Sequence, residues 1–515
     1  MFKKTYIILF TVLLGFLMVS CVDDLSTTPL DDDVVTSESV YETPEDYKQV
    51  LAKLYAGFSM TGQQGPAGNA DIQGIDEGFS SYIRQYFTHQ ENPTDEAIVG
   101  WNDEGLPEFN TLSWTASNDF VMAMYSRIYY EIAMTNEFIR NSEGREEAEI
   151  QAYVAEARFL RALSYWHALD LFGGNVPFVT EDDAVGAEPP MPTNADDLFA
   201  FIESELLDIA GTLPASGSQE YGRADRGAAW MLLAKLYLNA EVYIGQERYD
   251  DALTYAEDVS NAYTLHDNYQ ELFMADNHTA DGIIFPVTFD GINSTTFGGT
   301  TFLVFAQLGG SMNSADYGVN GGWAGNRTTP EFVNKFNTGD SRGMFHTDGQ
   351  TLEVDELGSF TSGYAIEKWT NKKSNGENGS DLEFVDTDFP MFRLADAYLM
   401  YAEAVVRGAS GGTEAQAVNY INALRFRAFG DNSGDITTSD LTLDFILDER
   451  ARELYWEGHR RTDLRRFGRF TSGEYVWAWK GDIQAGQSVS DKYEIYPLPF
   501  SDVNANPNLT QNPGY

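Results

Sequence analysis

The sequence predicts a mainly α-helical protein, in which a tetratricopeptide-like helical repeat scaffold carries long inserts of loops and short strands. The first observation is the spacing W-x2-L-[GA]-x2-Y within residues 230–237, followed by a second apolar pattern within residues 252–259. This is the tetratricopeptide arrangement, in which a small residue such as Ala234 lets two antiparallel helices approach closely. The second observation is an irregular copy of this pair, with apolar patterns at residues 398–405 and 417–424.

Five further segments have apolar residues at helical spacing, which is the third observation. Each is opened or closed by Asn, Asp, Pro or Gly, residues that favour helix ends. The segments are Pro44–Phe58, Phe120–Asn141, Glu147–Leu171, Asn194–Ala210 and Leu443–Glu457. Because the helical pattern recurs along most of the chain, we expect the scaffold to be built mainly of helices.

Two long segments lack this pattern and are predicted to be inserts in the scaffold. The first spans about residues 61–113, and the second spans about residues 281–388 and is rich in Gly, Asn, Ser and Thr. The second insert contains short runs that favour β-strands, at Ile283–Phe289 and Phe302–Phe305. Loops of this length within a compact protein are usually functional. We therefore expect the inserts to hold the ligand.

The charge of the chain excludes one class of partner. Its 515 residues include 33 Lys and Arg against 79 Asp and Glu, a formal net charge of −46. A chain with this charge would repel the phosphate backbone, so binding of nucleic acid is excluded. Hydrophobic residues make up 43% of the chain, enough for a large core, which argues against general disorder.

The N-terminal region has the pattern of a bacterial lipoprotein export signal. Two lysines precede the apolar run Tyr6–Val19, which is shorter than the roughly 17–25 residues that span a bilayer. Cys21, the single cysteine, follows this run. We predict a signal peptide over residues 1–20, lipidation at Cys21 and an acidic tether over residues 21–43. A generic secretory signal with an incidental cysteine is the alternative.

Four segments carry a pattern more specific than helical periodicity. They are Arg161–Phe178, Phe389–Arg407, Glu449–Phe470 and Tyr496–Tyr515. In this order they resemble the SusD/RagB family of outer-membrane lipoproteins of Bacteroidetes, over essentially the whole chain after the signal peptide. The resemblance implies a SusD-like domain over residues 44–515. It also implies a lipid-anchored protein at the cell surface that captures a glycan and passes it to a SusC-like TonB-dependent β-barrel transporter in the outer membrane.

Within the family, the likeness is closest to members of the starch-binding type. It is carried by residues 61–65, 73–78, 92–96, 272–277 and 297–300. Such members hold the curved face of an α-glucan, as in starch and malto-oligosaccharides, on an arc of two Trp and one Tyr, while Arg, Asp and Asn bond to hydroxyls. The corresponding residues are Trp101, Trp323, Phe297 in place of Tyr, Arg84, Asp76 and, near Glu104, Asn102 or Asp103. This sequence differs from the starch-binding pattern at Phe297 and near Glu104. Because other members of the family bind different glycans, a different glycan is an alternative ligand.

The residue types of this set also suit sugar binding on physical grounds. Aromatic rings pack against the C–H faces of sugars, while planar polar groups bond to hydroxyls. Trp101 and Trp323 lie in loop sequence flanked by glycine. In contrast, Trp166, Trp230 and Trp456 lie in helical patterns, so we predict that they belong to the core.

Two sets of arginines have structural interpretations. An alternative role for Arg84 is a salt bridge to Asp76 or Glu77. The strongest basic patch is formed by Arg460, Arg461, Arg465 and Arg466. Acidic residues at helical spacing are expected to neutralise this patch in an ion-pair network, and they are Glu449, Glu453, Glu457 and Asp463.

The sequence contains no motif typical of catalysis. A glycoside hydrolase needs two carboxylates at the scissile bond, but the many acidic residues supply such pairs by chance, so their presence is uninformative. No nucleophile elbow and no His-Glu-x-x-His sequence occurs. We therefore predict a binding protein, with a hydrolase or a protein-binding scaffold as alternatives. No cofactor is expected, although Asp276, Asn277 and Asp281 offer oxygen ligands for a structural calcium ion.

Overall fold

The computed structural model describes residues 40–184, 186 and 188–515. The predicted signal peptide, the lipidation site Cys21 and the predicted tether up to residue 39 lie outside the described residues. Lys48–Tyr515 form one compact unit. Within the described part of the chain, no helix is long and apolar enough to cross a membrane.

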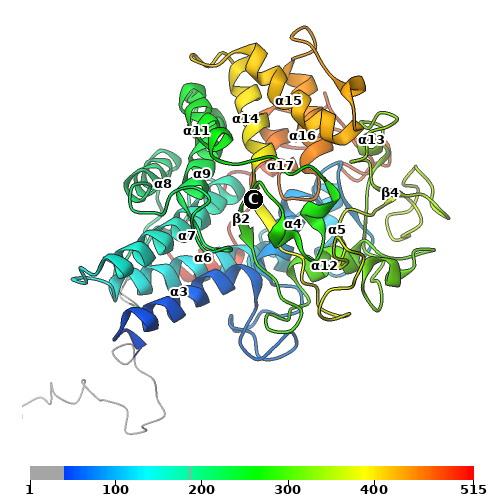
Figure 1. The fold of residues 1–515 in the computed structure, drawn as a ribbon. Coiled ribbons are helices and arrows are strands. Elements are labelled where there is room, and N and C mark those ends of the chain that lie inside the picture. The colour runs from blue at the N-terminus through cyan, green and yellow to red at the C-terminus, as the bar shows by residue number, and fades with distance from the viewer. Residues whose placement is uncertain (1–39, 185, 187) are drawn as a thin grey trace, which may run out of the picture. The chain divides into compact units, whose positions relative to one another are not determined.

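Helices dominate this unit (Figure 1). Their bounds are α3 Pro44–Ser59, α4 Tyr82–Gln90, α5 Pro107–Thr111, α6 Asp119–Arg140, α7 Ala148–Phe172, α8 Ala195–Ile209, α9 Arg226–Leu238, α10 Ala240–Ile244, α11 Tyr249–Ala262, α12 Gly299–Ala306, α13 Pro330–Val333, α14 Leu394–Val406, α15 Glu414–Phe429, α16 Leu443–Leu454, α17 Arg460–Arg466 and α18 Phe500–Ala505. Short 3-10 helices include η3 at Asn277–Thr279.

The described strands form three two-stranded antiparallel sheets. Their bounds are β1 Ile98–Val99, β2 Ile283–Val287, β3 Asn326–Arg327, β4 Phe345–His346, β5 Ala365–Ile366 and β6 Phe389–Arg393. β1 pairs with β3, β2 with β6, and β4 with β5. Each sheet joins segments far apart in the sequence or closes a long loop, so the strands connect the inserts to one another and to the helices.

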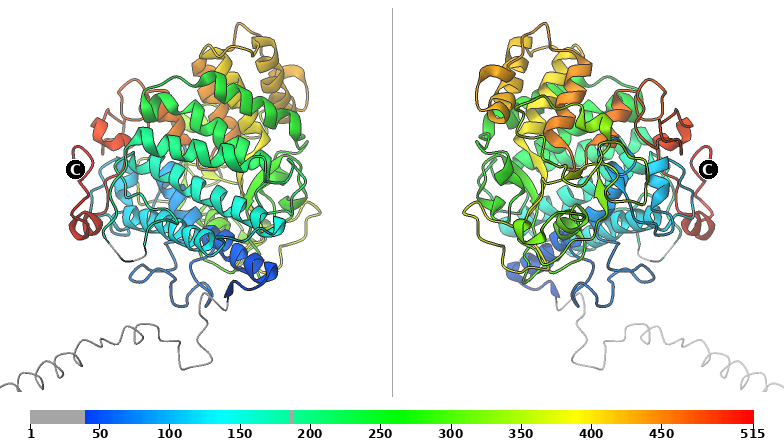
Figure 2. Two further views of the ribbon diagram at one scale, coloured as in Figure 1. Left: turned by 90° about the vertical axis from the view of Figure 1, so that its left-hand side faces the viewer. Right: turned by 90° about the vertical axis from the view of Figure 1, so that its right-hand side faces the viewer.

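Successive helices pack against one another in a continuous stack (Figures 1 and 2). Contacts run from α6 to α7, α8 and α9, and then from α9 to α11, α14 and α15. The two repeat pairs predicted from the sequence are α9 with α11 and α14 with α15. Ala234, Ala252 and Ala256 are fully buried, as small residues are where two helix backbones approach closely. The prediction of a mainly helical repeat scaffold is confirmed.

The single helices also match the sequence pattern closely. α3, α6, α7 and α8 begin and end within two residues of the predicted bounds. α6, for example, is capped by Asn118, whose side chain accepts hydrogen bonds from the N–H groups of Phe120 and Val121 at 2.9 and 3.1 Å. α16 ends earlier than predicted because Trp456 has a φ of +61°, and its indole N–H donates to the carbonyl of Glu96 at 2.9 Å.

Trp166 and Trp456 are buried as predicted, with 3% and 0% of their surface exposed. Trp230 is only half-buried, so its assignment to the core is wrong. The other half-buried residue of α9 is Arg226. Residues four apart lie on one face of a helix, and this pair therefore marks the one side of α9 that neighbouring helices leave uncovered.

The prediction of a strand at Phe302–Phe305 is also wrong. These residues lie in α12, where every residue is buried. Aromatic and β-branched residues favour strands only weakly, and packing overrides that preference. α12 packs against α4, and the rings of Phe302 and Phe87 meet edge to face at 5.6 Å. α4 itself lies within the first insert, where the sequence analysis places only irregular chain.

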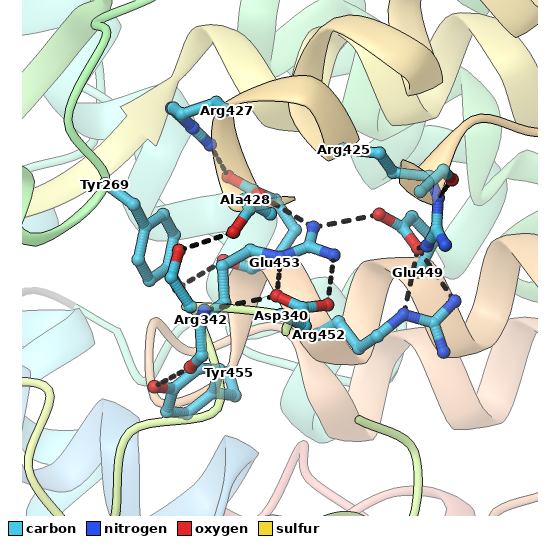
Figure 3. Close-up of polar contacts among 12 residues, drawn as sticks. Tyr269, Asp340, Arg342, Arg425, Arg427, Ala428, Glu449, Arg452, Glu453 and Tyr455 are labelled. Atoms are coloured by element: carbon cyan, nitrogen blue, oxygen red, sulfur yellow. Dashed lines mark hydrogen bonds and ion pairs between the residues drawn. The ribbon is translucent and has the colours of Figure 1, made fainter. Parts of the chain in front are cut away.

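A network of buried ion pairs joins α15, α16 and the loop at Asp340 (Figure 3). Arg342 bonds to the carboxylates of Asp340, Glu449 and Glu453 at 2.7, 2.8 and 3.1 Å. Arg425 on α15 bonds to the second oxygen of Glu449 at 2.8 Å. Buried charges are tolerated when they are paired and hydrogen-bonded, so this network fixes how the two helices pack against the loop.

The arginines of residues 460–466 form structural ion pairs, as predicted, and all but Arg465 are buried, but most of their partners differ from the predicted ones. Arg460 pairs with Asp95, Arg461 and Arg465 with Asp170, and Arg466 with Glu403 and Asp463. Of the predicted acidic partners, only Asp463 pairs with this set. Glu449, Glu453 and Glu457 pair with basic residues of other elements. α16 ends at Leu454 and α17 begins only at Arg460. Trp456 and Gly458 between them have positive φ, so helical spacing does not connect these residues with α17.

Candidate functional site

Trp101 and Trp323 are brought together by a short ladder between the two inserts. β1 pairs with β3, and beyond the ladder the Gly100 N–H donates to the Gly325 carbonyl at 2.8 Å. Trp101 follows β1 and Trp323 precedes β3, so the antiparallel pairing places both at the same end. The indole N–H of Trp101 donates to the main-chain carbonyl of Trp323 at 3.0 Å.

The main chain at Trp323 is held by the C-terminal end of α12. The Trp323 N–H donates to the Phe305 carbonyl at 2.8 Å, and the Gly325 N–H donates to the carbonyl of Ala306, the last residue of the helix, at 2.9 Å. Carbonyls in the last turn have no partner within their own helix. Ala324 has a φ of +51°, a left-handed conformation that turns the chain here. The sequence analysis did not predict α12 as a helix, yet this helix fixes the position of Trp323, one of the candidate site residues.

Trp101, Trp323 and Phe297 form a row of rings set at angles to one another. The ring centroids of Trp101 and Trp323 lie 6.4 Å apart with their planes at 50°. Those of Trp323 and Phe297 lie 6.3 Å apart at 60°. All three side chains are half-buried. We call these three rings the aromatic face.

Three phenylalanines that the sequence analysis does not identify support the aromatic face. Phe302 packs against Trp101 with centroids 6.1 Å apart, Phe305 against Trp323 at 5.0 Å, and Phe384 against Phe297 at 5.3 Å. Phe302 and Phe305 are three residues apart on α12, so they share one face of that helix. This spacing is the signal that could have identified them, had the segment been recognised as a helix.

Arg84 lies in the first turn of α4 and contacts the same rings. Its guanidinium carbon is 5.6 Å from the ring centroid of Trp101 and 4.8 Å from that of Phe302, within the range of cation–π attraction. One N–H group donates to the Gly78 carbonyl at 2.8 Å. Burial lowers the pKa of Arg84 to about 10, although Asp103 and Asp76 oppose this shift. The side chain therefore stays charged at neutral pH.

Asp76 and Asn102 lie at the exposed edges of this arrangement. Asp76 accepts a hydrogen bond from the Gly78 N–H at 2.9 Å, so it is linked to Arg84 through the main chain of Gly78. The structure has no salt bridge from Arg84 to Asp76 or Glu77 within the described residues, contrary to the alternative role considered for Arg84. Asn102 follows Trp101 directly and is exposed, as are the next two residues.

The predicted calcium ligands do not converge. Asp276 accepts hydrogen bonds from the main chain and the hydroxyl of Ser374 at 2.9 and 2.6 Å. The amide N–H groups of Asn277 donate to two carbonyls, and Asp281 is exposed. Among the residues that the structure describes, no group of three or more His, Cys, Asp or Glu could hold a metal ion. The side chains of Asp276 and Asn277 serve instead to close a loop.

Comparison with known proteins identifies the family. A model of the SusD family matches residues 347–515. The starch-binding protein SusD of Bacteroides thetaiotaomicron is 36% identical to this chain, over 96% of each. This chain belongs to the SusD family. The SusD-like protein P2 of Formosa agariphila is 25% identical, over 100% of this chain and 99% of that relative.

Solved structures of the SusD superfamily have the same fold. A SusD homologue from Bacteroides thetaiotaomicron superposes with a TM-score of 0.74 at 20% identity, covering 93% of this chain and 99% of that chain. The SusD-like fold predicted from the sequence is thus confirmed. The relative that is 36% identical is named as a binding protein, which supports the prediction that this chain is not an enzyme.

Proposed function

We propose that this SusD family protein is a surface lipoprotein that captures starch-type α-1,4-glucans and malto-oligosaccharides. The aromatic face of Trp101, Trp323 and Phe297 is the observation that carries the proposal. Further support comes from the relative named as a starch-binding protein, which is 36% identical over 96% of this chain. The residues of the aromatic face come from two inserts that the scaffold holds together, as expected of a ligand site on loops.

A curved glucan chain suits rings that are set at angles. The planes of the aromatic face differ by 50° between the first two rings and by 60° between the second and third. Each ring packs against the C–H face of one sugar. Successive sugars of an α-1,4-linked chain turn relative to one another, so successive faces can meet successive rings. A flat β-1,4-linked chain would meet only one ring at a time.

Polar groups at the edge of the aromatic face would bond to sugar hydroxyls. Arg84 is charged at neutral pH, and one N–H group already donates to Gly78, so its remaining donors are available to a ligand. Asp76 and Asn102 are exposed beside it and supply an acceptor and an amide. Planar groups of this kind form directional bonds to hydroxyls. They would fix the orientation of a chain that the rings hold by stacking.

We further propose that lipid on Cys21 anchors the protein in the outer membrane, facing the cell surface. A tethered binder must pass its ligand to a channel, and a SusC-like TonB-dependent β-barrel is the proposed partner. Cys21→Ala should abolish palmitate labelling and outer-membrane fractionation. Co-purification from detergent-solubilised outer membranes tests the partner, and recovery of the intact protein without any barrel would count against it.

Calorimetry of the wild-type protein against a set of oligosaccharides tests the ligand. Maltoheptaose and cyclodextrin should bind, whereas linear β-1,4-linked and β-1,3-linked glucans of similar length should bind more weakly or not at all. If no α-glucan binds, the proposed ligand is wrong. Binding of a β-linked glucan in its place would assign the same role to a different glycan.

A further inference from the structure

A hollow lies around Tyr221, outside the aromatic face. Its volume is about 470 Å³, and its lining includes Tyr221, His278, Ile292 and Lys373. We call it the Tyr221 hollow. An adjoining hollow of about 300 Å³ shares Tyr221 and Thr288. Neither hollow is lined by a residue of the aromatic face, so this is a separate part of the surface.

Tyr221 is an exposed ring held in one orientation. Tyr221 is 43% exposed, and few other large hydrophobic residues in the described part of the chain are exposed. Its hydroxyl donates to Asp388 at 2.8 Å, and Asp388 is only 4% exposed and also accepts from the Phe289 N–H at 2.8 Å. The ring of His278 meets Tyr221 edge-on at 6.2 Å. Because its hydroxyl is already bonded, what Tyr221 offers to a ligand is the face of a preorganised ring.

Other residues that line the hollow supply apolar and polar groups. Ile292 is 60% exposed, and its N–H donates to Asp290 at 2.8 Å, which fixes the turn that presents it. Lys373 is half-buried, and its ammonium group forms no ion pair within the described residues. An aromatic ring and an aliphatic group beside hydrogen-bonding groups match a sugar, which has C–H faces and a hydroxyl edge.

Two segments connect the Tyr221 hollow with the aromatic face. The loop from Asp290 to Phe297 begins at the hollow and ends at the aromatic face, and its two ends are close because the Phe289 ring packs against Gly299. The second segment runs from Phe384, which packs against Phe297, to Asp388, which anchors Tyr221. These four residue steps span at most about 14 Å even when fully extended. A chain of several sugars can cover that distance.

We propose that the Tyr221 hollow is a second contact for the same neutral glucan, occupied by sugars that extend beyond the aromatic face. This inference rests on the proposed function. The net charge of −46 disfavours an acidic polysaccharide, because the protein would repel it. The second contact would make affinity depend on the length of the glucan, since only a long chain reaches both the aromatic face and the Tyr221 hollow. Once such a chain is bound at the aromatic face, its binding in the hollow is intramolecular.

Chain-length dependence tests this inference. The wild type and the variants are used as detergent-solubilised full-length protein. Binding of maltotriose is measured by calorimetry, and binding of amylopectin is measured by affinity electrophoresis. Tyr221→Ala and Ile292→Ala should each weaken amylopectin binding roughly three- to tenfold, as loss of a central contact does elsewhere, while maltotriose binding is unchanged. Leu207→Ala on α8, which removes a side chain of 46% exposure, is the matched control and should change neither.

The outcomes separate this inference from the proposed function. Wild-type protein that binds neither ligand refutes the proposed function. If wild type binds both and the two variants still bind amylopectin as well as wild type, the Tyr221 hollow is not a contact for the glucan. A variant that weakens binding of maltotriose and amylopectin equally also contradicts the proposal that the Tyr221 hollow is a separate contact. Should Tyr221→Ala fail to fold, Ile292→Ala decides, because its side chain is 60% exposed and its removal leaves no buried group unpaired.

Discussion

The indole N–H of Trp101 donates a hydrogen bond to the main-chain carbonyl of Trp323 at 3.0 Å. One ring of the aromatic face is therefore oriented by the backbone of the residue that carries the next ring. Gly325 packs against the same indole, since a Cβ atom there would lie 2.3 Å from its Cζ2 atom. The rings are thus fixed before a ligand arrives, which lowers the entropic cost of binding.

Trp101→Ala and Trp323→Ala should each weaken binding of maltoheptaose by roughly 1–3 kcal/mol, about tenfold or more, because each removes a stacking face. Trp101→Phe should lose less, since it keeps a ring and lacks only the N–H donor. Calorimetry measures the affinities. Phe500→Ala, which removes an aromatic side chain of 59% exposure on α18, should bind normally. If the folded double mutant of Trp101→Ala and Trp323→Ala binds maltoheptaose as tightly as the wild type, neither residue belongs to the site.

Phe297→Tyr should bind maltoheptaose more tightly, by up to about 1.5 kcal/mol, because it adds a hydroxyl able to bond to a sugar. Phe297→Leu should bind more weakly, because it loses the ring face. Phe500→Tyr serves as the control for adding a hydroxyl to an exposed ring elsewhere. If Phe297→Leu binds as well as wild type in calorimetry, the third ring does not contact the ligand.

Asp95→Asn should destabilise the fold by about 3–5 kcal/mol, because it leaves the Arg460 charge buried without its partner. Asp95 now accepts two hydrogen bonds from Arg460, at 2.7 and 2.9 Å, and both side chains are buried. Urea unfolding measures the loss. The matched control is Asp444→Asn, which loses an ion pair to Arg469 of similar length, 3.0 Å, but on the surface. It should cost less than about 1 kcal/mol. Equal losses would contradict the prediction.

Acid should weaken the fold through its buried carboxylates. Burial alone would raise the pKa of Glu403, but Arg466 and Arg407 lower it to about 2, from its usual value of 4.5. A carboxyl whose pKa is lowered on folding stabilises the protein above its unfolded pKa, and that stability is lost as pH falls from about 4.5 toward 2. Such a shift corresponds to roughly 3 kcal/mol.

Urea unfolding of wild type and Glu403→Gln between pH 7 and pH 3 measures this contribution. The variant should be less stable at pH 7 and should lose less stability on acidification. The comparison of the variant with the wild type matters, because burial raises the pKa of Glu96 and Glu131 well above the usual value. Those groups favour the folded state as pH falls and oppose the trend. Parallel pH profiles for both proteins would contradict the assignment to Glu403.

Gly57→Ala should destabilise the fold, although alanine is normally the better helix former by about 0.5–1 kcal/mol. Gly57 lies inside α3, and a Cβ atom there would lie 1.5 Å from an oxygen of Glu131. Glu131 is 1% exposed, so its carboxyl group has little room to move. Thermal unfolding should therefore occur at a lower temperature. Ala52→Gly in the same helix is the opposite control, and a stabilised Gly57→Ala would refute the close contact.

Local sequence determined the helices of the scaffold. The predicted helix at Phe120–Asn141 is α6 at Asp119–Arg140, and Glu147–Leu171 is α7 at Ala148–Phe172. Periodicity and caps act between residues a few positions apart, so the sequence contains this information directly. The same holds for the loop context that distinguished Trp101 from the core residue Trp456. Family resemblance then supplied the candidate ligand-binding residues, whose role stays a prediction.

Tertiary structure alone decided which distant residues meet. α12 is helical because α4 covers it, Arg460 forms its ion pair with Asp95 rather than with an acidic residue of α16, and the Tyr221 ring is anchored by Asp388. Trp101 and Trp323 form one aromatic face only because β1 pairs with β3 and the end of α12 holds the turn at Trp323. Such contacts depend on the packing of the whole chain, which no local spacing encodes.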